Sequence, residues 1–206
     1  MADRRQILLA TRNGHKLAEL RRILQPRVQV RVLGLDDVPS YPELPESGAT
    51  FADNALIKAR EATARTGLIA VADDSGLAVD ALNGMPGVLS ARWAGSGHDD
   101  TANLELLLDQ LSDTPDDRLG AAFHCAAALV TPGGTELVRH GVMPGRLVRE
   151  RRGSNGFGYD PIFVPEGYQQ TSAELASAEK DRISHRGRAL QALLPDLVAV
   201  LAGADA

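Results

Sequence analysis

The sequence predicts an α/β fold in which helices pack on a mixed β-sheet. Short apolar stretches typical of strands alternate with segments whose leucines or alanines recur at helical spacing. A Thr-Pro-Gly-Gly turn at residues 131–134 joins two of the strands as a hairpin, so at least one strand pair should be antiparallel. The 206 residues, 44% of them hydrophobic, suit one domain with room for two lobes.

The first quarter of the chain is expected to hold two strands and a helix. Residues 6–10 form an apolar strand, residues 11–14 a polar turn, and the residues up to 24 a helix with three leucines on one face. Residues 28–33 form the second strand. Three prolines and Gly48 then mark residues 39–48 as a loop.

A second helix begins after Thr50, where Asp53 completes a capping box. Its buried face is a stripe of small and aromatic residues: Phe51, Ala55, Ala59 and Ala62. Residues 68–72 are expected to be a short strand that ends in a turn, Asp73-Asp74-Ser75-Gly76. Residues 77–82 are expected to form a separate strand.

The second half of the chain continues the alternation. A leucine stripe predicts a helix at residues 104–111, and alternating apolar residues predict a strand at 123–129 that the hairpin joins to the next strand at 135–142. A glycine-rich loop occupies residues 153–158. Ser184 is placed to cap a C-terminal helix, which Pro195 is expected to kink or divide.

Composition excludes several classes of protein. A net charge of −5 argues against a nucleic-acid-binding surface, so an anionic ligand would need a local cluster of cations. The single cysteine, Cys125, cannot form an intramolecular disulfide, which agrees with a reducing compartment. No apolar run is long enough to span a bilayer and no signal peptide is evident, so we expect a cytoplasmic protein without a membrane partner.

A cluster of cations follows the first strand. Arg12, His15 and Lys16 stand at a helix start, where free N–H groups and the helix dipole disfavour cations unless an anion is bound. With Thr11 and Asn13 as hydrogen-bonding side chains, the segment suits a phosphate, although the Walker A spacing is missing. A solvated loop with incidental charges explains the same residues equally well.

The adjacent acids Asp73 and Asp74 repel one another and call for a compensating charge. Mg²⁺ is a candidate, because it binds through one or two carboxylates together with substrate phosphates, and Glu43 or Glu46 could supply another ligand. On the second helix, Asn54 and Lys58 are four residues apart and share a face. An ordinary Asp-rich turn and a solvated lysine are the simpler alternatives.

Two later segments could contact a ligand. In the loop at residues 153–161, three glycines permit close backbone approach, and Phe157 or Tyr159 could stack on a base, although Tyr159 fits inward packing better. Near the C-terminus, His185 and Arg186 lie in the first turn of a helix, and Lys180 precedes them. Cations at that position cost roughly 0.3–1 kcal/mol each, which an acceptor-rich ligand would remove.

Together these segments resemble the inosine triphosphatase family, which cleaves non-standard purine nucleoside triphosphates. The matching stretches are LATRNGHKLAEL (9–20), FADNALIKAR (51–60), ADDSGLAVDALNGMPGVLSARW (72–93), GFGYDPIF (156–163) and SHRGRAL (184–190). The resemblance implies one domain over residues 1–206, in which a long mixed sheet flanked by helices forms two lobes with a central cleft. It also implies a homodimer.

The resemblance further implies a role for each matching residue. Thr11, Asn13, Lys16 and Lys58 resemble the triphosphate-binding residues, and Ser75 a substrate contact. Asp74 resembles the catalytic acid and a Mg²⁺ ligand, with Glu46 as the second carboxylate. Phe157, Gly158, Tyr159 and Asp160 resemble the base-binding loop, and Lys180, His185 and Arg186 the base and phosphate contacts. Arg12 departs from the family, in which many members carry glycine.

The implied reaction is attack of water on the α-phosphorus of ITP, dITP or XTP, with release of pyrophosphate. Donors such as Lys180 and Arg186 would select the 6-oxo group and reject adenine; how guanine is excluded is open. Three alternatives remain: a Maf-type pyrophosphatase acting on other nucleotides, a non-catalytic nucleotide-binding module, and a phosphatase with an aspartyl-phosphate intermediate. The DDSGL and SHR segments argue against the first, the paired acids against the second, and the lack of a DxD motif against the third.

Overall fold

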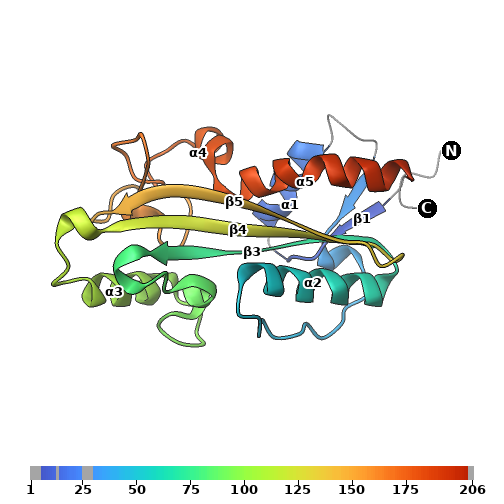
Figure 1. The fold of residues 1–206 in the computed structure, drawn as a ribbon, viewed down its shortest axis with the longest axis horizontal. Coiled ribbons are helices and arrows are strands. Elements are labelled where there is room, and N and C mark those ends of the chain that lie inside the picture. The colour runs from blue at the N-terminus through green and yellow to red at the C-terminus, as the bar shows by residue number, and fades with distance from the viewer. Residues whose placement is uncertain (1–5, 13, 25–29, 204–206) are drawn as a thin grey trace. The chain divides into compact units, whose positions relative to one another are not determined.

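The computed structural model describes residues 6–12, 14–24 and 30–203 (Figure 1). Across these residues, six strands form one sheet in the order β2-β1-β3-β4-β5-β6. Their bounds are β1 Gln6–Leu9, β2 Arg31–Leu33, β3 Ile69–Val79, β4 Gly120–Val130, β5 Glu136–Leu147 and β6 Phe163–Pro165. Since β1 pairs in parallel with β2 and β3 while β5 and β6 are antiparallel, the prediction of a mixed sheet is confirmed.

The helices connect and cover these strands. Their bounds are α1 Gly14–Leu24, α2 Phe51–Thr66, α3 Asp100–Gln110, α4 Ser177–Ile183 and α5 His185–Ala202. Pro195 lies inside α5 and does not divide it, so that part of the prediction is wrong. Among the described residues, none of the helices is both long and apolar enough to cross a bilayer.

The chain forms two compact units. Unit 1 contains Met1–Asp74, Ala126–Gly141 and Arg186–Ala206, and unit 2 contains Ser75–Cys125 and Val142–His185. The division falls within three strands, so β3, β4 and β5 each contribute residues to both units.

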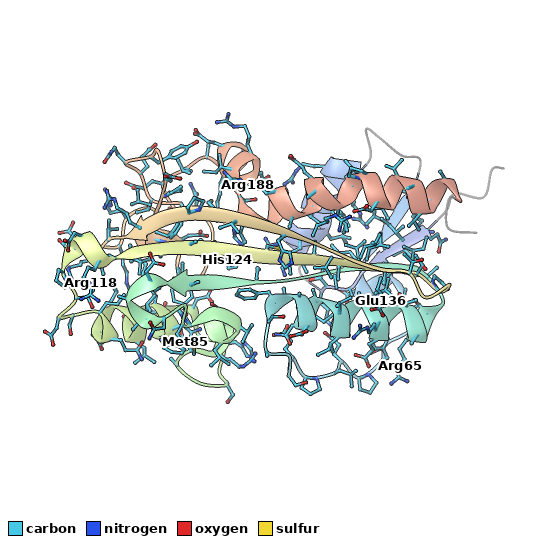
Figure 2. All side chains as sticks on the ribbon, viewed as in Figure 1. Arg65, Met85, Arg118, His124, Glu136 and Arg188 are labelled. Atoms are coloured by element: carbon cyan, nitrogen blue, oxygen red, sulfur yellow. The ribbon has the colours of Figure 1, made fainter. Side chains whose placement is uncertain are left out.

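The core of unit 1 contains the predicted alanine stripe of α2. Ala55 and Ala59 are fully buried and pack with Ala72 of β3 and with Ala126 and Ala128 of β4. Small side chains allow the helix to lie close to the strands. Figure 1 shows α2 on one side of these strands and α1 and α5 on the other. Figure 2 shows Arg65 on the outer side of α2, away from the sheet.

The core of unit 2 contains the predicted leucine stripe of α3. Leu104, Leu107 and Leu111 pack with Leu77 of β3 and Phe163 of β6. Phe163 is fully buried and meets Phe123 of β4 edge to face, with 4.7 Å between ring centroids. This packing holds the segment that follows the glycine-rich loop.

The predicted turn at residues 73–76 is wrong, because β3 runs unbroken from Ile69 to Val79. The strand lies inside the sheet between β1 and β4, so its backbone groups gain ladder hydrogen bonds that a turn would forgo. Of the separate strand expected at residues 77–82, the first three residues belong to β3 and Asp80–Leu82 form a 3₁₀ helix. The two acids therefore lie in the middle of a buried strand.

Candidate functional site

Asp73 and Asp74 are neighbours in β3 whose side chains point to opposite faces of the sheet. Side chains alternate along a strand, so Asp74 shares its face with Ala72, which packs under α2. Asp73 points to the other face, where Figure 1 shows α1 and α5. The strand conformation thus reduces the repulsion that the sequence suggested, and gives each carboxylate its own set of cations.

Asp73 joins the starts of two helices. Its Oδ2 accepts from Lys16 Nζ of α1 at 2.7 Å and from Arg186 Nε of α5 at 3.2 Å. Its side chain is only 3% exposed. Burial would raise the pKa of this carboxyl, but Lys16 and Arg186 more than offset burial, and the pKa lies well below the usual range. The ionised carboxylate is therefore an anion that balances cations at both helix starts.

Asp74 lies among polar residues of α2. Its Oδ2 accepts from Asn54 Nδ2 at 3.1 Å, and its Oδ1 lies 3.2 Å from Lys58 Nζ. Lys58 also pairs with Glu46 Oε1 at 3.0 Å, so one ammonium group bridges both carboxylates that were predicted to bind Mg²⁺.

The charges around Lys58 shift the acidity of the cluster. Burial raises the pKa of the Asp74 carboxyl, and Lys58 offsets only part of that rise. Burial alone would lower the pKa of Lys58, but Asp74, Asp73 and Glu46 outweigh it and raise the pKa. Lys58 is thus a fixed cation, while Asp74 is a better proton acceptor than an ordinary aspartate.

Lys16, Lys58 and Asp74 gather at one short stretch of β3, with Lys16 on the face of Asp73 and Lys58 on the face of Asp74. Lys16 pairs with Asp73, and Lys58 pairs with the adjacent Asp74 while also sensing the charge of Asp73. Thr11, at the start of the same turn, is half-buried, and its carbonyl accepts from Leu35 N at 3.2 Å. The predicted Asn13 lies outside the described residues.

Arg12 contacts two acids on other segments. Its Nε donates to Glu43 Oε1 and its Nη1 to Asp36 Oδ1, both at 2.9 Å. The side chain is 47% exposed. Glu43, which the sequence offered as an alternative metal ligand to Glu46, is therefore paired with Arg12.

The predicted base-binding loop lies in unit 2 and is held by Asp160. This carboxylate is buried, pairs closely with Lys180 Nζ, and accepts from Phe157 N at 2.9 Å. Gly156 has a φ of 79°, and a Cβ there would come within 2.1 Å of Asp160 Oδ2, so only glycine fits. The Phe157 ring is 58% exposed, and Lys180 Nζ lies 5.6 Å from its centroid. An exposed ring beside an ammonium group suits stacking on a base.

The next two residues support the loop. Gly158 N donates to Asp100 Oδ2 of α3 at 2.9 Å. Tyr159 packs inward, as its sequence context suggested, and its hydroxyl donates to Ser90 O at 2.9 Å. Burial raises the pKa of this phenol. Its side chain therefore supports the loop from beneath.

The remaining predicted residues lie where the chain passes between units. Ser75 is a half-buried residue of β3 directly after Asp74. His185 is the first residue of α5 and stacks on Phe123 of β4, with 5.0 Å between centroids and 12° between ring planes. The structure thus brings together one set of predicted residues around β3 in unit 1 (Lys16, Glu46, Lys58, Asp74 and Arg186) and another in unit 2 (Phe157, Gly158, Asp160 and Lys180).

Sequence reasoning offered Asp73 only as one of two paired acids and Asn54 only as a neighbour of Lys58 on one helix face. It did not predict that both hold other predicted site residues in place. Asp73 fixes Lys16 and Arg186, and Asn54 is fully buried against Asp74. The signal for Asn54 was its spacing, because a residue four positions before Lys58 on a capped helix lies on the same helix face. No local signal linked Asp73 to a residue 113 positions away.

The donor atoms of this cluster suit a hard divalent cation. Glu46 and Asp74 offer carboxylate oxygens that already converge on one cationic group, Lys58 Nζ. Mg²⁺ is usually held by one or two carboxylates and completes its coordination with phosphates and water. Within the described ranges, no group of three or more Asp, Glu, His or Cys side chains forms a larger metal site.

Comparison with known proteins extends the resemblance over almost the whole chain. The sequence profile of the Ham1 family matches residues 7–196. The dITP/XTP pyrophosphatase of Nocardia farcinica is 61% identical over 197 residues, covering 95% of this chain and 96% of that protein.

Solved structures agree with the sequence relatives. A nucleoside-triphosphatase/dITP/XTP pyrophosphatase from Mycobacterium abscessus is 63% identical and superposes with a TM-score of 0.79, covering 92% of this chain and 99% of that one. A HAM1 protein from Coxiella burnetii is 44% identical, with a TM-score of 0.88 and coverage of 94% and 98%. The predicted mixed α/β fold, a sheet flanked by helices, is confirmed by both.

Proposed function

Because the chain belongs to the Ham1 family, we propose that it hydrolyses non-standard purine nucleoside triphosphates, among them ITP, dITP and XTP, to the monophosphate and pyrophosphate. The observation that carries this proposal is the cluster around β3, where two lysines, an arginine and three carboxylates come together in unit 1. Such a cluster offers cations that can bind phosphates, next to a carboxylate that can orient a water molecule. The names of the relatives support the same activity.

Lys16 and Lys58 are proposed to bind the triphosphate, with Thr11 and Asn13 as further hydrogen-bonding groups. Both lysines are held by buried or half-buried carboxylates, so their ammonium groups keep defined positions before substrate binds. Preorganised cations stabilise the charge that develops on the phosphates without reorganisation during the reaction. Arg186, fixed on Asp73 beside Lys16, can extend this set of cations.

Asp74 is proposed to orient the attacking water and to accept its proton. The water oxygen forms a bond to the α-phosphorus, the bond from that phosphorus to the bridging oxygen breaks, and pyrophosphate leaves with the bonding electrons. The raised pKa of Asp74 favours proton acceptance, and Asn54 and Lys58 keep the carboxylate in one orientation.

Mg²⁺ is proposed to bind at Glu46 and Asp74. When bound, the ion would offset phosphate charge and lower the pKa of a water ligand. Lys58 lies between the two carboxylates and balances their charge. Lys58 would then contact phosphate oxygens when metal and substrate are present.

The base is proposed to stack on Phe157, with Lys180, His185 and Arg186 as candidates for contacts to it. Asp160 binds both Lys180 and the backbone N–H of Phe157, so the ammonium group and the aromatic ring keep fixed positions relative to one another. Backbone N–H groups of the loop and the lysine are donors that a 6-oxo group satisfies and an amino group leaves unpaired, which disfavours adenine. Ser75, Gly158 and Tyr159 remain predicted substrate contacts.

From the family resemblance we also propose that the protein forms a homodimer. We propose that it is located in the cytoplasm. The nearest rivals in function are a Maf-type pyrophosphatase with other nucleotide substrates and a nucleotide-binding module without turnover. The identity to dITP/XTP pyrophosphatases argues against both.

A product assay tests the proposed function. The full chain is incubated with dITP, XTP, dATP and dGTP, with and without Mg²⁺, and pyrophosphate and orthophosphate are measured separately. We expect equimolar monophosphate and pyrophosphate from dITP and XTP only when Mg²⁺ is present. Orthophosphate as the product, or equal turnover of dATP, would contradict the proposal.

A further inference from the structure

Asn54 connects the two acidic parts of the unit 1 cluster. It is fully buried near the start of α2, and both ends of its amide are used. Nδ2 donates to Asp74 Oδ2 at 3.1 Å, and Oδ1 accepts from Gly48 N at 2.8 Å. The two bonds fix which way the amide points, since the reverse orientation would place donor against donor at Gly48.

Gly48 belongs to the segment that carries Glu46. A Cβ at position 48 would lie 2.5 Å from Asp53 Cβ and 2.7 Å from Asn54 Oδ1, so the backbone can approach Asn54 only with glycine here. The segment has a second anchor on α2, because Leu44 N donates to Glu61 Oε2 at 2.8 Å. Glu46 thus stands between two backbone positions, 44 and 48, that are both bonded to the same helix.

The three side chains that hold this segment form one stripe of α2. Asn54, Lys58 and Glu61 follow the i, i+4, i+7 spacing that places residues on one helix face. Asn54 and Glu61 bind the backbone on either side of Glu46, and Lys58 binds its carboxylate. The helix therefore sets both the place of Glu46 and, through Asn54, the orientation of Asp74.

We propose that Asn54 is a positioning residue that couples the Glu46 segment to the carboxylate of Asp74. A hydrogen bond from Nδ2 restricts Asp74 to one rotamer, while the bond to Gly48 N fixes the distance from Asp74 to the Glu46 segment. This inference rests on the proposed function, because its consequence is measured as turnover of a nucleoside triphosphate.

The variant Asn54→Asp separates the two bonds. An aspartate has the same shape and still accepts from Gly48 N, but it cannot donate to Asp74 and places like charge beside it. We expect kcat for dITP to fall about tenfold or more, as a lost charge-assisted hydrogen bond suggests, with KM changed less than about threefold. Gly48→Ala disrupts the other bond, from Gly48 N to Asn54 Oδ1. We expect this variant to lower kcat and to raise the Mg²⁺ concentration needed for half-maximal rate.

Thr63→Val is the matched control. Thr63 is a buried polar residue of the same helix, and its hydroxyl donates to Val130 O at 3.2 Å, with no bond to the cluster. Thr63→Val should lower the melting temperature, less than Asn54→Asp does because it buries no charge, while leaving kcat at the wild-type value. If the two variants lose kcat in proportion to their loss of melting temperature, Asn54 has only a structural role and the inference is wrong.

A double-mutant cycle checks that Asn54 acts through Asp74. In the Asp74→Asn background, Asn54→Asp should change the residual kcat far less than in the wild type, because the group on which it acts is already altered. Equal fold losses in both backgrounds would overturn the inference. Failure of the proposed function is distinguishable, since the wild-type protein would then release no pyrophosphate from dITP.

Discussion

The two sets of predicted site residues hold their charges in different ways. In unit 1, Asp73 and Asp74 are both buried. Asp73 pairs with Lys16 of α1 and Arg186 of α5, and Asp74 pairs with Lys58 of α2. In unit 2, one carboxylate, Asp160, holds both a lysine and the loop backbone, and leaves the ring of Phe157 exposed. The first arrangement suits fixed charge around phosphates, and the second suits an apolar contact. Losses in unit 1 should therefore change turnover or stability, and losses in unit 2 should change substrate affinity.

Asp74→Asn should give the largest loss of turnover. The amide keeps the size of the side chain but cannot accept a proton from water, so we expect kcat to fall by about 10²–10⁴-fold. Binding of dITP, measured by calorimetry with Ca²⁺ in place of Mg²⁺, should weaken much less. Turnover close to the wild-type rate would show that Asp74 is not the principal acid.

Asp73→Asn should instead act on stability. Removing the carboxylate from a buried ion pair is strongly destabilising, and Asp73→Asn removes it from two such pairs, with Lys16 and with Arg186, so the free energy of unfolding should fall by about 3–5 kcal/mol. Urea unfolding of both proteins at neutral pH measures this difference. Asp36→Asn, at a 75%-exposed partner of Arg12, is the control and should have little effect.

The loss of unfolding free energy in Asp73→Asn should depend on pH. The folded-state pKa of Asp73 lies below the unfolded value of about 3.9, so its carboxylate stabilises the fold above that pH. The stabilisation is lost as the pH falls below about 3.9 towards the folded-state pKa. The difference in unfolding free energy between wild type and Asp73→Asn should therefore shrink in acid. A constant difference across this range would show that the ion pairs are not its source.

Helix α2 and strand β3 show which features the sequence alone predicts and which it does not. The capping box of Thr50 and Asp53 and the alanine stripe of α2 depend on residues three or four positions apart, so the sequence alone predicts them. The course of β3 through Asp73 and Asp74 depends on ladder bonds to strands distant in sequence. Asp73 gains its partners from 57 and 113 positions away. The local sequence of residues 73–76 therefore indicated a turn, and the strand is recognised only from its pairing with the neighbouring strands.

The resemblance to a known family identified most of the site residues for a different reason. It supplied Lys16, Lys58, Asp74 and Glu46 as a set, and the structure pairs Lys58 with Asp74 and Glu46 and pairs Lys16 with the neighbouring Asp73. It gave no role to the residues that hold them. Asn54 and Asp73 stand inside two of the matching stretches, but their roles follow from their hydrogen bonds. The central cleft stays a prediction.

Phe157→Ala should raise KM for dITP without affecting stability. Stacking of a base on an aromatic ring contributes about 1–3 kcal/mol, which corresponds to a rise in KM of roughly 5-fold to 160-fold. The ring is 58% exposed, so the melting temperature should stay the same. Val198→Ala on α5, where the side chain is 36% exposed, is the control for loss of exposed apolar surface and should change neither quantity. A fall in kcat with unchanged KM would place the ring outside the base contact.

Arg12→Gly should have the smallest effect, and it tests whether exposed pairs behave like the buried ones around β3. Arg12 ties the turn before α1 to Glu43 and Asp36, but the side chain is 47% exposed, so solvent and salt screen both contacts. We expect a small rise in KM for dITP at low ionic strength that disappears near 1 M salt, with no change in kcat. A rise that persists in high salt would mean that Arg12 contacts the triphosphate directly, since a contact to a multiply charged ligand is screened less completely than a pair of single charges.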